Sequence, residues 1–496
     1  MSLMSLSSKP LSERQVFGFF VLAAFVYVLP LILADHAYID DNWRSLAAGS
    51  AWTGQGRWLA DLFYHGLTFT SAAPNVFPLP LLIALVAIAL ALKSLTFHYA
   101  GQPTWVDCLV VLPLWYNPFF LQNLSYQYDG PTMALSLVAV IYAMTLRFKS
   151  VALQVVVPGV LVALGMGLYQ LCINVFLGLC CIELVRWVSE AKPWRALGSL
   201  LALKSSQLIV GALVYGVTGY PSIIAQRLPM QALSEQGLVR VWGNLQWVAS
   251  NVALLFEGGH RGLLWAMLVC AMLGGWQVLW ALRQRPDGRW RKTLLGVACL
   301  LCVPALLLLV PGTTLLFRDF NEGARTLMGF AVLGVFVYDL ARRGLVAIDP
   351  RLGLLLAIPL LSMLALSFAY GRVLSVQKEF ATNALFSLGH DIASNPQLRE
   401  AKRIYMSRTS SDRWLDEASG SFKVMPVLKY ILNVNFFMLA ENLPRVGVRN
   451  VFPENERRNA TLLGYRGYTP VVDSQFYNLY RVGDYGFIVM KEPPRR

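Results

Sequence analysis

Two adjacent carboxylates, Asp40 and Asp41, stand directly after the first long apolar run of the sequence. Arg44 follows one helical turn later, where its guanidinium can pair with either carboxylate or bind a phosphate. A carboxylate in a partly dry site has a raised pKa and can accept a proton from a hydroxyl group. The pair therefore predicts base catalysis beside a phosphate. The plainer alternative is that one Asp caps a helix and the other forms a salt bridge.

Three further arginines stand in other polar segments between the apolar runs. Arg57 follows a glycine shortly after the two carboxylates, whereas Arg318 and Arg325 belong to a much later loop. The guanidinium fork suits a phosphate or pyrophosphate, although the two later arginines could instead pair with Asp319 and Glu322. The residues that we expect to bind phosphate are Arg318, Arg325, Arg44 and Arg57.

Two other polar segments have the composition of a sugar-binding surface. The segment Gln122–Pro131 combines amides, a carboxylate and flat aromatic rings, all of which can contact sugars. Asp129 directly precedes Gly-Pro and an apolar run, so it can also cap a helix. Tyr169 and Gln170 form a polar step between two apolar runs, where Gln170 either faces a cavity or caps a turn. The predicted substrate-binding residues are Asp129, Tyr126, Tyr169 and Gln170.

Other catalytic signatures are missing from the sequence. It contains no HExxH, P-loop, GxSxG or dinucleotide-binding fingerprint. No His, Cys, Asp and Glu cluster has the spacing of metal ligands, so no metal site is predicted. All seven cysteines lie inside apolar runs, which argues against a disulfide framework.

The composition places these residues in a membrane protein. The chain has 496 residues, of which 56% are hydrophobic and only 14% are charged, whereas soluble domains are about 25% charged. The formal charge of +14 does not indicate nucleic-acid binding, because many Lys and Arg residues lie in short loops between apolar runs. The first run follows Lys9 and Arg14 without a clear cleavage site, so we expect an uncleaved first span.

The apolar runs predict about eleven transmembrane helices, since one crossing takes about 20 residues. The region 151–187 is ambiguous between two spans around Tyr169-Gln170 and one helix with a re-entrant piece. The predicted spans are 16–34, 77–98, 104–120, 131–147, 151–168, 170–187, 199–219, 263–283, 293–311, 326–341 and 352–371.

The positive-inside rule orients these spans. One set of loops carries seventeen Lys and Arg residues and is therefore cytoplasmic, which places the N-terminus inside and the tail outside. The candidate residues then belong to the first (35–76), second (121–130) and fifth (312–325) outer loops and to the step at 169–170. In the first outer loop, apolar residues at helical spacing predict an amphipathic helix on the bilayer surface. The opposite loops carry only Arg44, Arg57, Arg227, Arg240, Arg261, Arg318 and Arg325.

We therefore expect two domains, a transmembrane domain (1–371) and a polar C-terminal domain of mixed α/β structure (372–496). Ser394-Asn395-Pro396 predicts a helix start. The segments 477–482 and 485–490 flank Gly483-Asp484 and predict a β-hairpin.

Several of these motifs resemble those of the serotype-converting O-antigen glucosyltransferases of bacteria and their phages. They are Asp40-Asp41-x-x-Arg44 with Gly56-Arg57, then Asn123-x-Ser125-Tyr126-x-x-Asp129, and then Gly167-x-Tyr169-Gln170. They occur in the expected order and on the same predicted face. The resemblance covers about residues 1–345 and is weaker in the tail.

This resemblance implies an all-α polytopic membrane fold of the GT-C type, with periplasmic juxtamembrane helices and a small periplasmic C-terminal domain. It implies that an undecaprenyl-phosphate-linked hexose, with glucose expected, is the donor. The acceptor would be a lipid-linked O-antigen of lipopolysaccharide, or a related surface glycan, on the periplasmic side of the bacterial inner membrane. An acidic residue of the first outer loop would act as base, and we prefer Asp40 to Asp41. A single displacement would invert the anomeric centre.

No cofactor is expected. A divalent ion such as Mg²⁺ or Mn²⁺ could assist the leaving group, but arginine can take its place, and we favour a metal-independent reaction. The expected partners are the lipid-linked donor and acceptor and the membrane lipid, with no nucleic acid.

Two other classes of function compete with this interpretation. A flippase or exporter of a lipid-linked sugar predicts polar residues deep in several spans, often with pseudo-repeats, and the sequence shows neither clearly. An O-antigen polymerase or ligase would be expected to use a large outer loop between late spans, whereas the large outer domain here is C-terminal. For that domain, capping the active site and holding the acceptor glycan both remain open.

Overall fold

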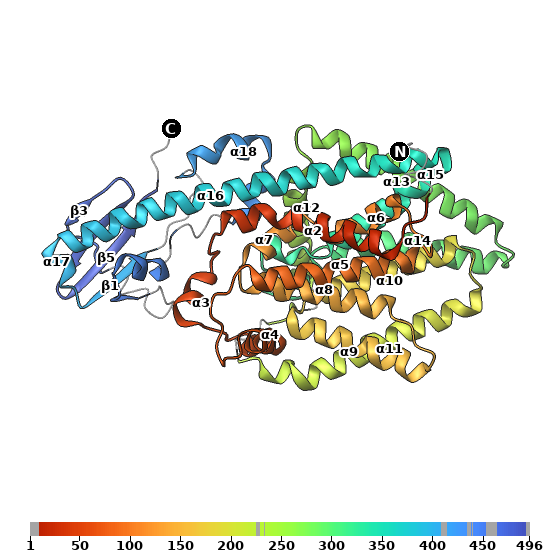
Figure 1. Ribbon diagram of the computed structural model, residues 1–496, viewed down its shortest axis with the longest axis horizontal. Coiled ribbons are helices and arrows are strands. Elements are labelled where there is room, and N and C mark those ends of the chain that lie inside the picture. The colour runs from red at the N-terminus through yellow and green to blue at the C-terminus, as the bar shows by residue number, and fades with distance from the viewer. Residues whose placement is uncertain are drawn as a thin grey trace.

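A computed structural model of the chain describes residues 9–224, 229–232, 234–407, 414–433, 438, 440–452 and 464–492. The described residues form a bundle of long helices followed by a small mixed sheet (Figure 1). The long helices are α2 (Glu13–Ala34), α5 (Leu79–Tyr99), α8 (Asp129–Thr145), α9 (Val151–Leu168), α10 (Cys172–Ser189), α11 (Trp194–Thr218), α12 (Glu235–Ala253), α13 (His260–Gln284), α14 (Arg289–Leu309), α15 (Phe330–Ile348) and α16 (Ala357–Ser394).

Within the described residues, eight helices are long and apolar enough to cross a membrane. Their outward faces carry large apolar side chains, and Leu213, Trp276 and Leu300 are each more than 60% exposed. Such a surface is stable against lipid and unfavourable in water. The membrane-protein prediction is therefore supported, whereas the count of about eleven spans stays a prediction. The eight helices are α2, α5, α9, α10, α11, α13, α14 and α16.

The three other predicted spans do not form helices that are long and apolar enough to cross a membrane, each for a different reason. The run at 104–120 is broken into α6 (Trp105–Val111), a 3-10 turn at Leu112–Leu114 and α7 (Phe120–Ser125). Helix α8 has only 17 residues, and α15 carries Asp339 and two arginines.

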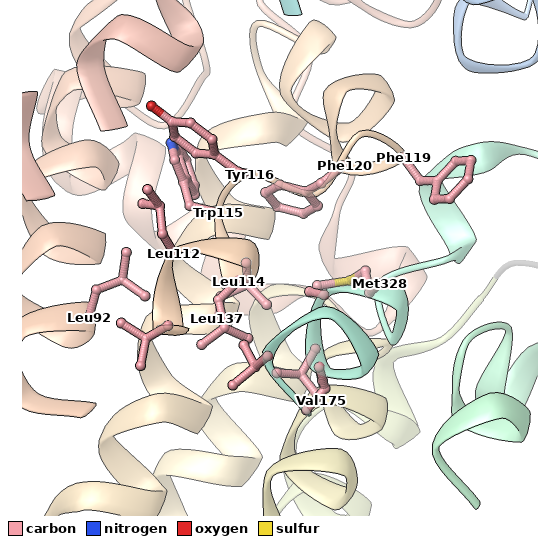
Figure 2. Packing of buried hydrophobic residues seen from close by; sticks show 14 of the residues in the cluster. Leu92, Leu112, Leu114, Trp115, Tyr116, Phe119, Phe120, Leu137, Val175 and Met328 are labelled. Atoms are coloured by element: carbon pink, nitrogen blue, oxygen red, sulfur yellow. The ribbon is translucent and has the colours of Figure 1, made fainter. Parts of the chain in front are cut away.

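The broken segment lies at the centre of the bundle. Pro113 and Pro118 lack the amide hydrogens that a continuous helix needs. Some of the freed carbonyls find partners elsewhere, since the Tyr27 hydroxyl donates to the Asn117 carbonyl at 3.0 Å. Figure 2 shows side chains of this segment packed with Leu137 of α8 and Val175 of α10. Irregular backbone is tolerated at membrane depth when protein surrounds it.

The ambiguous region 151–187 forms two separate helices, α9 and α10. They meet at Tyr169-Gln170, where the amide of Tyr169 still donates to the carbonyl of Gly165. The polar step in the sequence therefore marks a helix boundary, which agrees with the first of the two predicted alternatives.

Loops that were predicted to share a face come together at one end of the bundle. The first outer loop bonds to the second through Asp41 and the amide of Gln127, and the second bonds to the fifth through Asn123 and the carbonyl of Arg325. The basic loops gather at the opposite end, where Arg186 bonds the carbonyl of Tyr99. The number of spans and their orientation stay predictions.

Two short helices occupy the end that contains the candidate residues. Helix α3 (Asp41–Ala47) follows α2 directly, and α4 (Trp58–Thr68) comes next along the chain. In Figure 1, α4 is seen almost end-on, so its axis runs across those of the long helices. The amphipathic helix predicted in this loop is therefore present, with Leu62 on its exposed side.

The longest helix, α16, links the bundle to the C-terminal sheet (Figure 1). Its 38 residues span about 57 Å, whereas a bilayer core is about 30 Å thick. It packs along α2 and continues without a break through residue 371. From Ala384 onward, its side chains belong to a second hydrophobic core, which they share with the C-terminal sheet. The division into two domains near this residue stays a prediction.

The C-terminal part contains a mixed sheet of five strands among the described residues, in the order β2-β1-β5-β4-β3. The predicted hairpin is confirmed, and so is the predicted helix start, where Asn395 accepts the amides of Gln397 and Leu398. The short elements are α17 (Pro396–Arg399), β1 (Arg403–Ser407), α18 (Ser419–Val424), α19 (Val427–Leu432), a 3-10 segment at Ala440–Val446, β2 (Val451–Phe452), β3 (Val472–Asp473), β4 (Tyr477–Val482) and β5 (Tyr485–Met490).

Candidate active site

Asp41 holds two loops together. Its carboxylate accepts the backbone amides of Tyr38 at 2.9 Å, Gln127 at 2.8 Å and Tyr128 at 3.2 Å, and the side chain is fully buried. Burial raises the pKa of Asp41 to about 8, against the opposing effect of these three amide donors. With its oxygens directed at the backbone, Asp41 has a structural position in the site.

Asp40 has a different environment, although it is the preceding residue. It occupies the N-cap position of α3, but its side chain makes no capping bond. Among the described residues, none forms a hydrogen bond or ion pair with its carboxylate, which is only half-buried. Burial, together with the charge of Asp129, raises the pKa of Asp40 above the usual range of an aspartate. Asp40 is thus the carboxylate that is available for proton transfer.

The backbone that presents Asp40 is strained. Ile39 has a φ of 46°, in the left-handed region that β-branched residues rarely adopt. The hydrogen bonds that backbone amides donate to the Asp41 carboxylate hold this turn in place. Strain of this kind persists only where the surroundings impose it, and it is common at functional sites.

Asp129 pairs with two buried arginines. Its carboxylate lies 3.3 Å from the Arg44 guanidinium, forms an ion pair with Arg57 and accepts the indole N–H of Trp52 at 2.9 Å. Arg57 also donates to the carbonyl of Leu168 at 2.9 Å. Since both arginines already have a buried carboxylate partner, they are less available to a phosphate than the sequence suggests.

Arg325 differs from Arg44 and Arg57 in having no carboxylate partner of its own among the described residues. Its guanidinium donates to the Tyr126 hydroxyl at 2.9 Å, and among the described residues no carboxylate lies within ion-pair distance. Gln122 fixes the backbone by accepting the Arg325 amide at 2.7 Å, and Asn123 donates to its carbonyl at 3.2 Å. Arg325 and Asp40 interact electrostatically, so the two groups lie in one field.

Aromatic side chains line the same region. The rings of Tyr38 and Tyr126 meet edge to face with centroids 4.8 Å apart. The Tyr169 hydroxyl donates to the Arg325 carbonyl at 3.4 Å, and its ring lies 5.4 Å from the Arg57 guanidinium. A carboxylate without a partner, a guanidinium without a carboxylate partner and flat rings are groups of the kind that bind a sugar phosphate.

Comparison with known protein families agrees with the resemblance that the sequence motifs indicate. Residues 29–336 match the family described as Glucosyl transferase GtrII. The chain belongs to this family. The match contains every candidate residue from Asp40 to Arg325 and ends before the C-terminal sheet. The resemblance inferred from the motifs is therefore confirmed at the level of the family.

One curated relative is an uncharacterized 55.3 kDa protein from the gtrB 5' region of Salmonella phage P22. It is 28% identical over 218 residues, which is 44% of each chain, so the alignment spans less than half of that relative. No solved structure matches the chain. The family description names a glucosyl transferase, and eight of the described helices are long and apolar enough to cross a membrane.

The GtrII structure brings most of the predicted site residues together and separates two of them. Gln170 is engaged with other residues, since its amide donates to the carbonyl of Gln55 at 2.8 Å and to the Tyr215 hydroxyl at 3.0 Å. Arg318 is exposed, and its side chain makes no hydrogen bond or ion pair with the site. The residues that do gather are Asp40, Asp41, Arg44, Arg57, Tyr126, Asp129, Tyr169 and Arg325.

No group of three or more His, Cys, Asp or Glu residues that could hold a metal ion occurs in the part of the chain that the structure describes. The dependence of the reaction on a metal stays a prediction.

Sequence reasoning missed the residues that the C-terminal domain and α16 bring to the first outer loop. Asn442 donates to the side-chain oxygen of Asn42 at 2.7 Å, and Arg445 donates to the same oxygen at 3.1 Å. Lys378 of α16 donates to the carbonyl of Asp35 at 2.7 Å. These contacts join residues more than 300 positions apart, so no local pattern could have indicated them.

Proposed function

We propose that this GtrII-family protein transfers a hexose, with glucose as the expected sugar, from undecaprenyl phosphate to a lipid-linked O-antigen or related surface glycan. The reaction takes place on the periplasmic side of the bacterial inner membrane. Family membership supports the sugar transfer, and the location of the relative beside gtrB in a phage supports the glycan. The distribution of Lys and Arg supports the side of the membrane.

The observation that carries this proposal is the contrast between two neighbouring carboxylates. Asp41 is saturated with amide donors, whereas Asp40 has no partner among the described residues and lies in the field of Arg325. A base needs an ionised carboxylate that is free to approach a hydroxyl proton. Asp40 meets this requirement and Asp41 does not.

In the proposed step, the acceptor hydroxyl oxygen forms a bond to the anomeric carbon of the donor sugar. Its proton passes to the Asp40 carboxylate, and the bond from the anomeric carbon to the phosphate oxygen breaks. The electron pair of that bond leaves with undecaprenyl phosphate. A single displacement of this kind inverts the configuration at the anomeric carbon.

Arg325 stabilises the charge that develops on the leaving phosphate. Its guanidinium is held by Tyr126, while its backbone is fixed by Gln122 and Asn123, so it needs little reorganisation. The ion pairs between Asp129 and the two buried arginines keep the surrounding loops rigid. The prenyl chain stays in the lipid beside the exposed apolar faces of the helices.

The test is transfer by the purified protein in detergent or liposomes, with labelled undecaprenyl phosphate-glucose and a lipid-linked O-antigen. We expect transfer by the wild-type protein, and a loss of about 10³-fold or more in Asp40→Asn with unchanged thermal unfolding. Arg399→Gln on the exposed end of α17 is a matched control and should transfer normally. Transfer by Asp40→Asn at the wild-type rate would remove the proposed base.

The same preparation distinguishes a flippase. Liposomes that contain the protein and the labelled sugar lipid, but no acceptor, would move the lipid across the bilayer if the protein were a flippase. Movement without any transfer in the complete assay would overturn the proposed reaction.

A further inference from the structure

A polar cavity of about 250 Å³ lies where the first outer loop, α16 and the C-terminal domain meet. Its lining includes the side-chain amides of Asn42, Asn75, Gln127 and Asn442. Amides of this kind offer both donors and acceptors, as a hydroxyl-rich ligand requires. No residue of the proposed catalytic group lines this cavity, so it is a separate feature of the outer end.

The cavity also contains an imidazole and two cations. Burial, followed by the charges of Lys378 and Arg445, lowers the pKa of His36 to about 4. The His36 ring is therefore neutral near pH 7 and can donate one hydrogen bond and accept another. Lys378 and Arg445 are engaged with the first outer loop, through Asp35 and Asn42.

A second hollow lies on the surface of the helix bundle that is expected to face lipid. It has a volume of about 330 Å³ and is lined by α2 and α16, with Leu33 and Phe368 as its apolar walls. Arg372 lines it as well, is exposed, and forms no ion pair among the described residues. Gly371 packs directly against Pro30 at this point, which brings the two helices close together.

One face of α16 connects the two hollows. Phe368, Arg372 and Ser375 line the lipid-facing groove, and Lys378 and Thr382 line the polar cavity. Successive members of this series are three or four residues apart, the spacing of a single helix face. The face therefore runs from apolar side chains, through the free cation Arg372 and the bound cation Lys378, to hydrogen-bonding groups.

We propose that this face of α16 binds the lipid-linked acceptor, with the prenyl chain in the groove between α2 and α16, the phosphate at Arg372 and the glycan in the polar cavity. This inference rests on the proposed function and adds the location of the second substrate. The order of apolar, cationic and amide groups along the face matches the order of tail, phosphate and sugar in such a molecule.

The arrangement separates the two substrates. Asp35 and His36, which precede the turn at Tyr38–Asp41, line the cavity, whereas Asp40 in this turn does not line it and lies under the influence of the charges of Arg325 and Asp129. Asn42 of the cavity wall and Asp40 belong to the same turn at the start of α3, and in the proposed complex the reacting hydroxyl of the glycan lies where this turn meets the cavity. The C-terminal domain, through Asn442 and Arg445, completes the wall and so selects the glycan.

The test compares Michaelis constants for the two substrates in the transfer assay. Thr382→Trp fills the cavity from an exposed position on α16, and Asn383→Trp, one residue later and outside the lining, is its matched control. Arg372→Gln removes the free cation, with Arg399→Gln as control. We expect Thr382→Trp and Arg372→Gln to raise the KM for a lipid-linked O-antigen about tenfold or more, with the KM for undecaprenyl phosphate-glucose unchanged.

A second readout separates the groove from the cavity. The same O-antigen released from its lipid by mild acid is used as a competitor of the lipid-linked acceptor. Arg372→Gln should leave its inhibition constant unchanged, because the phosphate is absent, whereas Thr382→Trp should raise it. The inference fails if the wild-type protein transfers glucose but both variants keep the wild-type KM for the acceptor, or if only the KM for the donor rises. If the wild-type protein transfers nothing, the proposed function itself fails.

Discussion

The Asp41 carboxylate accepts the backbone amide of Gln127 at 2.8 Å, and this bond is one of those that join the first outer loop to the second. The same carboxylate accepts two further amides, from Tyr38 and Tyr128. Asp41 therefore determines where Asp40 is presented, although it takes no part in the proposed proton transfer.

Replacing Asp41 by alanine should destabilise the protein more than it changes the chemistry. Three backbone amides would lose their acceptor, and a buried donor left without one costs about 1–3 kcal/mol. We expect Asp41→Ala to lower the midpoint of thermal unfolding in detergent and the yield of folded protein. Asp40→Ala, which removes no hydrogen bond among the described residues, is the control and should unfold like the wild type. Equal thermal stability of the two variants would contradict this assignment.

The two arginines of the fifth outer loop should differ strongly in importance. Arg325 lies beside Tyr126 in the field of Asp40, whereas Arg318 is exposed and makes no side-chain bond to the site. Removing one preorganised stabilising group costs about 10²–10³-fold in rate. We expect a loss of this size in kcat for Arg325→Gln, and less than about threefold for Arg318→Gln, because an exposed charge contributes little. A larger loss in Arg318→Gln than in Arg325→Gln would contradict this ranking of the two arginines.

Local features of the fold were predictable because they depend on neighbouring residues. The hairpin around Gly483-Asp484 and the helix start at Asn395 form where turn and capping residues indicate them. The long apolar runs likewise form long helices. The break in the run at 104–120 was missed, because the buried surroundings that tolerate Pro113 and Pro118 come from other helices.

The division of labour within the site was not predictable in the same way. Asp40 and Asp41 are identical in type and adjacent, and two of the amides that distinguish them, those of Gln127 and Tyr128, come from the next outer loop. Arg44 and Arg57 appeared equivalent to Arg325 until Asp129 was found to pair with both. Such distinctions depend on contacts between distant segments, which a sequence pattern does not contain.

The side of the membrane on which the site lies can be tested by cysteine labelling. Asp129 is buried, so the label is better placed at Ser71 in the exposed part of the first outer loop. In a background without the seven native cysteines, we expect an impermeant maleimide to label Ser71→Cys in cells whose outer membrane alone is permeabilised. Lys149→Cys, between α8 and α9, should react only once the inner membrane is opened. The reverse pattern would place the proposed site in the cytoplasm.

The dependence of activity on pH should show the ionisation of Asp40. The carboxylate acts as a base only when it is ionised, so kcat/KM is full above its pKa and falls as the pH drops below it. Burial and the charge of Asp129 raise this pKa, so the acidic limb should lie above the range of an ordinary aspartate, which ionises near about 4. A profile that stays flat down to that range would exclude Asp40 as the base.

The positive charge of Arg325 provides a sharper form of the same test. This guanidinium favours the ionised form of Asp40 and so lowers its pKa. Arg325→Gln removes that charge, which raises the pKa of Asp40, and the acidic limb of the remaining activity should move to higher pH. Arg318→Gln, which removes an exposed arginine of the same loop, should leave the limb where it is in the wild type. A merely structural role for Arg325 would lower the rate at every pH without moving the limb, and that outcome would separate Arg325 from the ionisation of the base.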